Sequence, residues 1–213
     1  MADISTELLI RRCQEGNMDA FSELMALYQN KVYSFCLHMT GNHEDAQDLA
    51  QEGFIRIYRA LHSFRGQSAF TTWAYRIVAN LWSNEIRKRK KQHTVPLDAP
   101  VHTGEGEEVQ RTLSDLSNSP EEELEAKEEK ALVWQALSLL SEDQRTVIVL
   151  REMYGYSYDE IAASLNCSTG TIKSRLNRAR QNLTQKLREM TQTVNMQQTV
   201  QTATKNEKRV GIP

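Results

Sequence analysis

Helical periodicity runs through most of this sequence and stops for a long stretch only once. Apolar residues recur at three- and four-residue spacing over residues 20–91 and again over residues 121–190, as they do in packed amphipathic helices. Residues 92–120 between them hold three of the four prolines and keep no period. No β alternation of useful length appears. The pattern predicts an all-α fold of two small helical domains, at 1–91 and 121–190, joined by a flexible acidic linker at 92–120.

Charge is strongly segregated along the chain, although the net charge is only −2. From Asp98 to Lys130 there are eleven Asp or Glu against three Lys or Arg, whereas residues 87–91 read RKRKK. From Ile161 to Arg188 there are six positive residues and no acid. Two basic surfaces separated by an acidic segment are predicted, and basic surfaces attract phosphate.

Several other classes of protein are disfavoured by the sequence. No run reaches the roughly 18 apolar residues of a membrane span, and the N-terminus lacks a signal pattern, so we expect a cytoplasmic protein. The three cysteines have no CxxC spacing and indicate buried thiols. Cys36, His38 and His43 form at most a weak metal-ligand cluster. There is no Gly-rich phosphate loop and no Ser-His-Asp arrangement, so we expect no catalytic activity, metal or cofactor.

A helix-turn-helix is predicted over residues 157–183. Ser157 and Glu160 form a capping box that starts a short helix, and Ser168 can cap a second helix after the break at residues 166–168. The apolar stripe of the second helix, Ile172, Leu176, Ala179 and Leu183, leaves a basic face that can enter the major groove. A solvated helix in a bundle is the alternative, but caps, turn and charge agree on the first interpretation. The candidate DNA contacts are Ser168, Thr171, Lys173, Ser174, Arg175 and Arg178.

The preceding segment, SEDQRTVIVLREM, is predicted to be a helix on which this unit packs. Ser141 and Gln144 fit a second capping box, and Val147, Ile148, Leu150 and Met153 are its core candidates. The Gln- and Thr-rich stretch at 191–213 offers no face to bury and is predicted to be a disordered tail.

Residues 45–61, DAQDLAQEGFIRIYRAL, are predicted to form a helix with two unlike faces. Gly41 can end the helix before it, and Asn42 can cap this one. The outer face is acidic with an apolar centre, which is more typical of a protein-binding surface than of a DNA surface. An ordinary acidic helix face is the alternative. The buried stripe is predicted to be Ala46, Leu49, Ala50, Gly53 and Ile57, and the outer face Asp48, Gln51, Glu52 and Ile55.

Residues 64–91, FRGQSAFTTWAYRIVANLWSNEIRKRKK, are predicted to form a loop and a long helix. Of the tryptophans, Trp73 rather than Trp82 is assigned to the buried stripe, with Phe70, Ala74, Ile77, Val78, Leu81 and Ile86. Amides, arginines and nearby aromatics on the other face suit a duplex groove or single-stranded DNA. This polar face is predicted to hold Thr72, Arg76, Asn80, Ser83, Asn84 and Arg87.

Taken together, these stretches resemble a bacterial RNA polymerase sigma factor of the sigma-70 family, extracytoplasmic function (ECF, group 4) class. The resemblance is close at YSYDEIA, at GTIKSRLNRAR and at DLAQEGF. It implies that residues 121–190 read the minus-thirty-five element. It also implies that residues 1–91 bind core polymerase through Asp48, Gln51, Glu52 and Phe54.

By the same resemblance the 64–91 segment reads and melts the minus-ten element, with Asn80 as a direct base contact and a flipped base held in the loop. The residues implied are Phe64, Gln67, Ser68, Phe70, Arg76, Asn80, Asn84 and Arg87. The implied partners are core RNA polymerase, at its clamp helices and flap, promoter DNA and an anti-sigma factor. The linker would thread the polymerase cleft. Its negative charge should also repel DNA, so the isolated chain is expected to bind promoter DNA poorly. A stand-alone dimeric helix-turn-helix regulator and a helical adaptor that binds only proteins are the alternatives.

Overall fold

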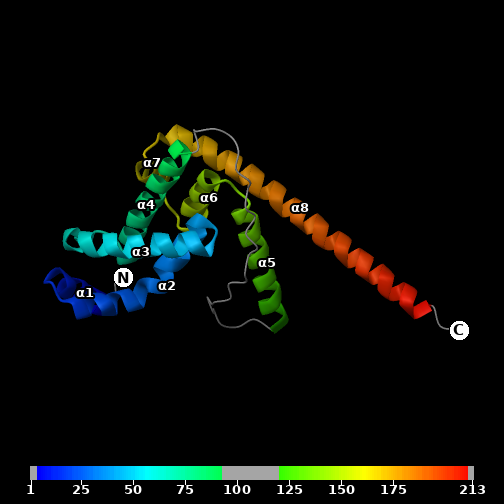
Figure 1. Cartoon of the computed structure of the whole chain (residues 1–213), viewed down its shortest axis with the longest axis horizontal. Coiled ribbons are helices and arrows are strands. Elements are labelled where there is room, and N and C mark those ends of the chain that lie inside the picture. The colour runs from blue at the N-terminus through cyan, green and yellow to red at the C-terminus, as the bar shows by residue number, and fades with distance from the viewer. Residues whose placement is uncertain (1–3, 93–119, 211–213) are drawn as a thin grey trace.

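The computed structural model describes the backbone of residues 4–92 and 120–210 and the side chains of residues 6–92 and 129–192. Within these ranges all regular elements are helical, which confirms the predicted all-α fold (Figure 1). The predicted linker lies almost wholly outside them. The first helical group comprises α1 (Ile4–Gln14), α2 (Met18–Thr40), α3 (His43–Ala60), the 3-10 turn η1 (Leu61–Ser63) and α4 (Phe70–Gln92), and the second comprises α5 (Pro120–Ser138), α6 (Glu142–Ile148), the π-helical turn η2 (Val149–Met153), α7 (Tyr158–Leu165) and α8 (Thr169–Val210).

Capping residues set the ends of α2 and α3. Asn17 Oδ1 accepts a hydrogen bond from Ala20 N at 2.9 Å, which caps α2. Gly41 ends that helix with a φ of 78°, a left-handed conformation that favours glycine. Asn42 Oδ1 accepts from Asp45 N at 2.8 Å and starts α3. The predicted end at Gly41 and start at Asn42 are confirmed.

The buried stripe of α3 is also as predicted: Ala46, Leu49, Ala50, Gly53 and Ile57 are all buried. Here α3 and α4 approach closely. A Cβ built on Gly53 would lie 3.1 Å from Val78 Cγ2, so even an alanine here would crowd the Val78 side chain.

The tryptophan assignment on α4 was wrong. Trp82 is 1% exposed and its Nε1 donates to Thr146 Oγ1 of α6 at 3.0 Å, whereas Trp73 is only half-buried. Ser83, predicted on the polar face, is buried as well. The error at Trp82 arises because α6 of the second helical group covers this side of α4. The hydrophobic periodicity of α4 alone cannot show which of its residues pack against another helical group.

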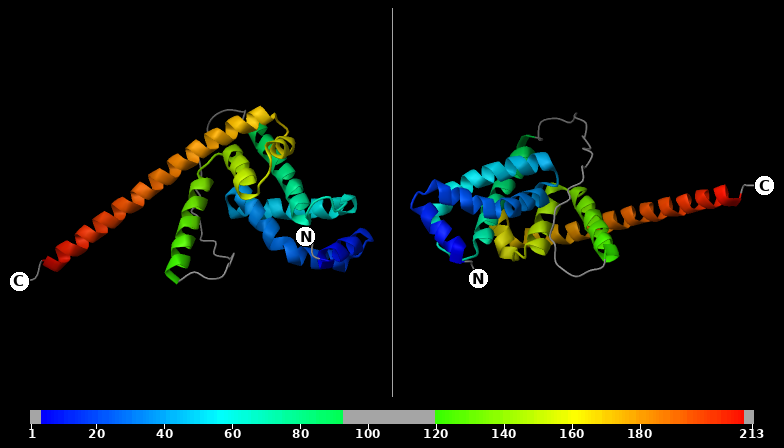
Figure 2. Two further views of the ribbon diagram at one scale, coloured as in Figure 1. Left: turned by 180° about the vertical axis from the view of Figure 1, so that it is seen from behind. Right: turned by 90° about the horizontal axis from the view of Figure 1, so that it is seen from below.

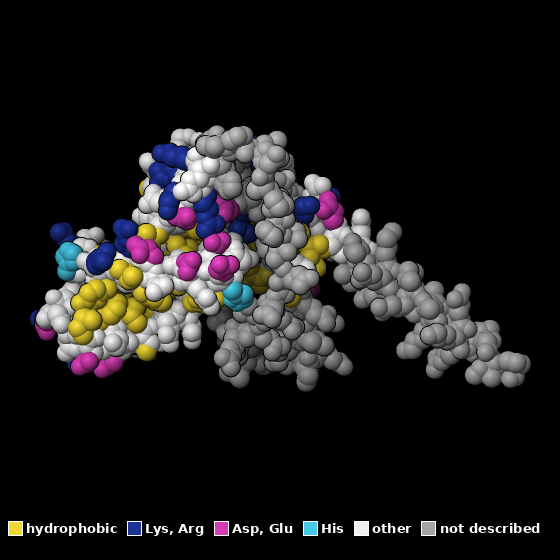
Figure 3. Space-filling view, viewed as in Figure 1, with side chains coloured by type: hydrophobic (Ala, Val, Ile, Leu, Met, Phe, Trp, Pro, Cys, Tyr) yellow, Lys and Arg dark blue, Asp and Glu magenta, His cyan; other side chains and the backbone are white. Residues whose placement is uncertain are grey.

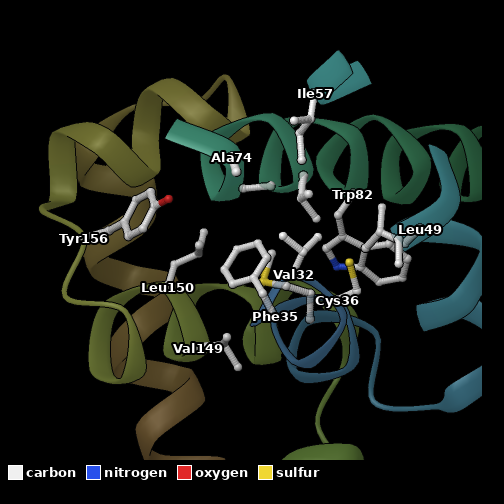
Figure 4. Close-up of a cluster of buried hydrophobic side chains, with 14 of the residues drawn as sticks. Val32, Phe35, Cys36, Leu49, Ile57, Ala74, Trp82, Val149, Leu150 and Tyr156 are labelled. Atoms are coloured by element: carbon white, nitrogen blue, oxygen red, sulfur yellow. The ribbon is translucent and has the colours of Figure 1, made fainter. Parts of the chain in front are cut away.

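The two helical groups pack directly on each other and share one hydrophobic core. Figure 4 shows Leu150 of η2 projecting toward α4 beside Phe35 of α2. The rings of Phe35, Tyr75 and Tyr154 form a cluster across this seam, with centroids 4.5–5.1 Å apart. The sequence predicted a separate core for each domain, so the joint core is a finding of the structure alone.

The segment from α6 into η2 departs from its prediction in two places. Ser141 stands at the N-cap but its side chain makes no cap hydrogen bond, and Gln144 Oε1 instead accepts from Asn182 Nδ2 of α8 at 3.1 Å. Val147, Ile148 and Leu150 are buried as predicted, but Met153 is 42% exposed. The π-helical turn at 149–153 carries more residues per turn than an α-helix, so it rotates Met153 off the buried face.

Helix α8 continues to Val210, whereas the sequence predicted disorder from residue 191. Extending an existing helix needs no new nucleus, and the stretch holds no Gly or Pro before residue 211. Figure 2 shows α8 reaching well beyond the other helices. Across the described residues, no helix is both long and apolar enough to cross a membrane.

Two isoleucines of α3 provide a test of the core. Ile57 is fully buried and Ile55 is 40% exposed. We expect Ile57→Ala to lower the free energy of unfolding by about 2–5 kcal/mol, through lost burial and a residual cavity. Ile55→Ala, on the same helix, should change it by about 0.5 kcal/mol or less. Urea denaturation followed by circular dichroism measures both values. Equal losses would contradict the assignment of faces on α3.

A buried histidine at the seam gives a pH-dependent prediction. His38 Nδ1 lies 2.8 Å from Tyr154 Oη and its ring stacks on Trp134. Burial lowers the pKa of His38 from 6.5 to about 4. Between these pH values the unfolded chain binds more protons than the folded one, so the free energy of unfolding falls as pH falls through this window.

We therefore expect His38→Gln to be less sensitive to acid than wild type when urea denaturation is compared at pH 7 and pH 5. The control is His62→Gln, which changes an exposed histidine and should keep the wild-type dependence. A wild-type pH dependence in both variants would show that His38 does not titrate in this range on unfolding.

Candidate nucleic-acid and protein interfaces

The outer face of α3 presents carboxylates around an apolar centre. Asp48 and Gln51 are exposed, and the exposed fraction of Ile55 is 40%. Glu52 is partly exposed and pairs with Arg56 Nε at 2.7 Å. Phe54 sits at the flank of this face, half-buried against the core. Four of these side chains thus form the predicted outer face, and Phe54 is only partly accessible to a partner.

Two further residues enlarge the apolar part of this surface. Tyr58, 42% exposed, stacks edge-on against Phe21 of α2, and its hydroxyl lies 2.9 Å from Met18 Sδ. Figure 3 shows hydrophobic side chains gathered on the N-terminal helices. The spacing of Ile55 and Tyr58 on one helix could have indicated Tyr58 from the sequence. Met18 comes from another helix and could not have been found that way.

The loop before α4 rests on an aromatic cluster. Phe64 contacts Trp73 and Phe70, with centroids 5.1 and 6.0 Å apart. Gln14 Nε2 donates to Phe64 O at 2.9 Å and so ties the loop to α1. Gln67 is exposed at the loop surface. Of the four predicted pocket residues, Phe70 is 4% exposed and packs within the aromatic cluster, while Phe64, Gln67 and Ser68 are at least partly accessible.

The polar face of α4 has the predicted members except Ser83. Asn80, Asn84 and Arg87 are exposed, and Arg87 Nη2 donates to Asn84 Oδ1 at 2.6 Å. Arg76 is exposed but pairs with Glu160 of α7. A shallow basic hollow follows toward the end of the helix, lined by Asn84, Arg87, Lys88, Lys91 and Gln92. Lys88, Lys91 and Gln92 were not on the predicted site, although RKRKK marked the area.

Arg89, in the same basic run, is instead held by acids. Its Nη2 donates to Asp45 Oδ1 at 2.6 Å, and its Nη1 lies 3.2 Å from Glu142 Oε1. The hydrogen bond from Arg89 lowers the pKa of Asp45, and its counterpart raises the pKa of Arg89. This arginine therefore links α3, α4 and α6 rather than facing solvent.

The helix-turn-helix forms as predicted. Glu160 N donates to Ser157 Oγ at 3.2 Å and Ser157 N donates to Glu160 Oε2 at 2.9 Å, which completes the capping box. The hydrogen bonds that Ser157 N and Oγ donate to Glu160 Oε2 lower the pKa of Glu160. Asn166 takes a left-handed φ of 48° in the turn, and Ser168 Oγ caps α8 by accepting from Thr171 N at 3.1 Å.

The predicted reading face of α8 holds both exposed residues and residues engaged in the cap or in an ion pair. Ile172, Leu176 and Ala179 are buried and Leu183 packs against the core, as predicted. Among the candidates, Lys173, Ser174 and Arg178 are exposed. Ser168 and Thr171 are used in the cap, and Arg175 is half-buried, 3.9 Å from Asp143. No group of three or more potential metal ligands occurs within the described ranges.

A capped helix-turn-helix, a second basic helix and an acidic-apolar helix face on an all-α scaffold define a transcription protein that contacts both DNA and another protein. The comparisons with known proteins agree. Residues 24–92 match Sigma-70 region 2, and residues 130–183 match Sigma-70, region 4.

Relatives share most of the chain. The RNA polymerase sigma-H factor of Pseudomonas aeruginosa is 41% identical over 175 residues, covering 81% of this chain and 89% of its own. The ECF RNA polymerase sigma-E factor of Escherichia coli is 38% identical over 186 residues, covering 86% and 95%. The sigma factor RpoE of Bartonella quintana, solved in complex with the anti-sigma factor NepR, has a TM-score of 0.55 at 27% identity, covering 79% of this chain and 96% of its own. The chain belongs to the sigma-70 family of RNA polymerase sigma factors, in the ECF class.

Proposed function

We propose that this sigma factor binds core polymerase through the outer face of α3 and reads promoter DNA with α4 and α8. The observation that carries the proposal is the presence, in one chain, of an exposed acidic-apolar helix face and two basic helix faces. In this proposal residues 1–91 form region 2 and residues 121–190 form region 4, with 92–120 as the linker between them.

The proposed polymerase contacts are Asp48, Gln51, Glu52 and Phe54. The carboxylates of Asp48 and Glu52 would meet basic residues of the clamp helices. Ile55 and Tyr58 would supply the apolar area of the interface. Interfaces of this kind combine an apolar centre with a polar rim, and Tyr is enriched in them. Region 4 would meet the flap.

For the minus-ten element we propose that Arg76 and Arg87 bind phosphates and that Asn80 and Asn84 reach base edges. A base flipped from the duplex would rest in the loop at residues 64–70, on the aromatic cluster. Phe64, Gln67 and Ser68 would contact it, with Phe70 as support. The basic hollow at the end of α4 would hold the neighbouring backbone.

For the minus-thirty-five element we propose that α8 enters the major groove. Lys173 and Arg178 are the exposed cations on its reading face, and Ser174 is a neutral contact. Arg175 can join them once it leaves Asp143, whereas Ser168 and Thr171 orient the start of the helix and its backbone toward phosphate. Each contact is weak alone, but tethering through polymerase makes the combination strong.

The protein is proposed to act in the cytoplasm as an initiation factor, without catalytic activity or cofactor of its own. The likeness to an RpoE captured with the anti-sigma factor NepR supports a similar inhibitory partner for this chain. An anti-sigma factor that covers the face of α3 would compete directly with polymerase.

The test is run-off transcription with sigma-free core polymerase on a library of promoter fragments. We expect promoter-specific transcripts with wild type. Asp48→Ala/Glu52→Ala and Lys173→Ala/Arg178→Ala should each lower them by about tenfold or more, because lost contacts of this kind cost roughly 1–3 kcal/mol apiece. Glu129→Ala and Lys186→Ala, which remove charge elsewhere, should transcribe normally.

Binding measurements separate the two surfaces. The α3 variant should lose affinity for core polymerase, and the α8 variant should keep it but lose promoter recognition. No transcripts with any variant or wild type, together with specific DNA binding by a dimer of the isolated chain, would instead indicate a stand-alone regulator.

A further inference from the structure

The loop that is proposed to hold the flipped base is fixed at its two ends and not between them. It leaves the 3-10 turn η1 at Phe64 and enters α4 at Phe70, which is 4% exposed. Among the described residues, no hydrogen bond joins residues 65–68 to any other part of the chain. The placement of the loop therefore depends on the groups that anchor its two ends.

One side chain of α1 anchors the first end. Gln14 Nε2 donates to Leu61 O at 3.1 Å and to Phe64 O at 2.9 Å. A primary amide carries two N–H donors, so one side chain can serve both carbonyls. Leu61 O also accepts from Phe64 N at 3.1 Å, in the hydrogen bond that closes η1. Gln14 thereby holds the backbone at the point where the loop leaves η1.

The position of Gln14 is itself determined by the packing and the end of α1. The helix ends at Gln14, and Gly16 follows with a left-handed φ of 90°, a conformation that favours glycine. The side chains that pack α1 on the core are Leu9, Ile10 and Cys13, all buried. The anchor is therefore in place before any DNA is bound.

A second contact connects α1 with the other end of the loop. Thr6 is 4% exposed, and its Oγ1 lies 3.2 Å from Tyr28 Oη of α2. The ring of Tyr28 packs on Phe70, with centroids 4.8 Å apart, and Phe70 contacts Phe64 at 6.0 Å. Helix α1 thus reaches both ends of the loop, directly through Gln14 and by way of Tyr28.

Helix α1 lies outside the surfaces that are proposed to touch polymerase or DNA. It precedes residues 24–92, the range that matches Sigma-70 region 2. Figure 1 shows it at the opposite end of the first helical group from α7 and α8. Both N–H groups of Gln14 already donate within the chain, so they are not free to donate to a base. A change at Gln14 should therefore act on DNA through the loop.

This inference rests on the proposed function: we propose that Gln14 is a positioning residue for recognition of the flipped minus-ten base. It holds the backbone at Leu61 and Phe64 so that Gln67 and Ser68 meet the base in one arrangement. A loop without hydrogen bonds of its own samples many conformations, and the fraction able to accept the base sets the apparent affinity. Loss of the anchor lowers that fraction.

Hydrogen exchange of the full chain tests the anchor without DNA. Gln14→Met keeps an unbranched side chain with similar helix propensity but removes both donors. We expect the Phe64 amide, followed by NMR, to exchange about three- to tenfold faster than in wild type, as for the loss of one or two exposed hydrogen bonds, while amides of α3 are unchanged. Gln29→Met, at an exposed glutamine of α2, is the matched control and should behave as wild type. Equal exchange of Phe64 in Gln14→Met and wild type overturns the proposal.

Promoter probes that lack single bases test the role in recognition. Holoenzyme is titrated with a probe whose minus-ten segment is single-stranded, either intact or without one base at a time. On the intact probe we expect Gln14→Met to weaken binding about three- to tenfold. On the probe without the flipped base, Gln14→Met and wild type should bind within about twofold of each other, because the loop then has no base to hold. Gln29→Met should match wild type on every probe.

Coupling to one base separates positioning from a general loss of structure. The affinity of Gln14→Met for core polymerase should equal that of wild type. If Gln14→Met weakens binding to every probe by the same factor, or to none, the positioning role is overturned.

Gln67→Ala keeps this inference apart from the proposed function, because it removes a proposed direct contact with the base. We expect it to couple to the same base as Gln14→Met. If Gln67→Ala couples to a base and Gln14→Met does not, the minus-ten assignment of the loop stands and the positioning role falls. If neither Gln67→Ala nor removal of any single base weakens binding, the proposed loop site itself fails.

Discussion

The buried guanidinium of Arg145 is the interaction on which the joint core depends. It donates from Nε to Met39 O and from Nη1 to Ser138 O, each at 3.1 Å, and so satisfies carbonyls near the C-terminal ends of both α2 and α5. Only glycine fits beside it, because a Cβ at position 41 would lie 2.3 Å from Arg145 Nη1. A cation from α6 is thereby fixed against the turn between α2 and α3. The two helical groups are held in one orientation, from which the meeting of α4 with α6 and α7 follows.

A core organised around a charge differs from an apolar one in how it can be parted. Burial lowers the pKa of Arg145 because it disfavours the charged form, and hydration would relieve that cost if the groups separated. Trp82, Thr146 and His38 also carry polar atoms at the seam that water can satisfy. Contacts between domains that move are commonly more polar than permanent cores. The seam is thus stable enough to order both groups and polar enough to open.

The sequence predicted correctly those features of the fold that depend on interactions between residues close together along the chain. The ends of α2 and α3, the buried stripe of α3 and the capping box at Ser157 depend on residues three or four apart, and all could be predicted from the sequence. The burial of Trp82 could not be predicted in this way, because its partner Thr146 lies 64 positions away in the sequence. The same holds for the candidate sites: exposure of Asp48 and Lys173 follows from helix faces, whereas the pairing of Arg76 with Glu160 does not. Met153 was misplaced because a π-helical turn changes the phase that periodicity assumes.

The distribution of free and occupied surfaces bears on the order of assembly. In this structure the outer face of α3 is exposed, while Arg76, Arg89 and Lys90 are paired with acids. Polymerase could therefore dock on α3 without first opening the chain, whereas DNA would have to displace carboxylates. A partner can shift such an equilibrium only by binding the open form better. On this argument polymerase can bind before Arg76, Arg89 and Lys90 of α4 leave their acid partners.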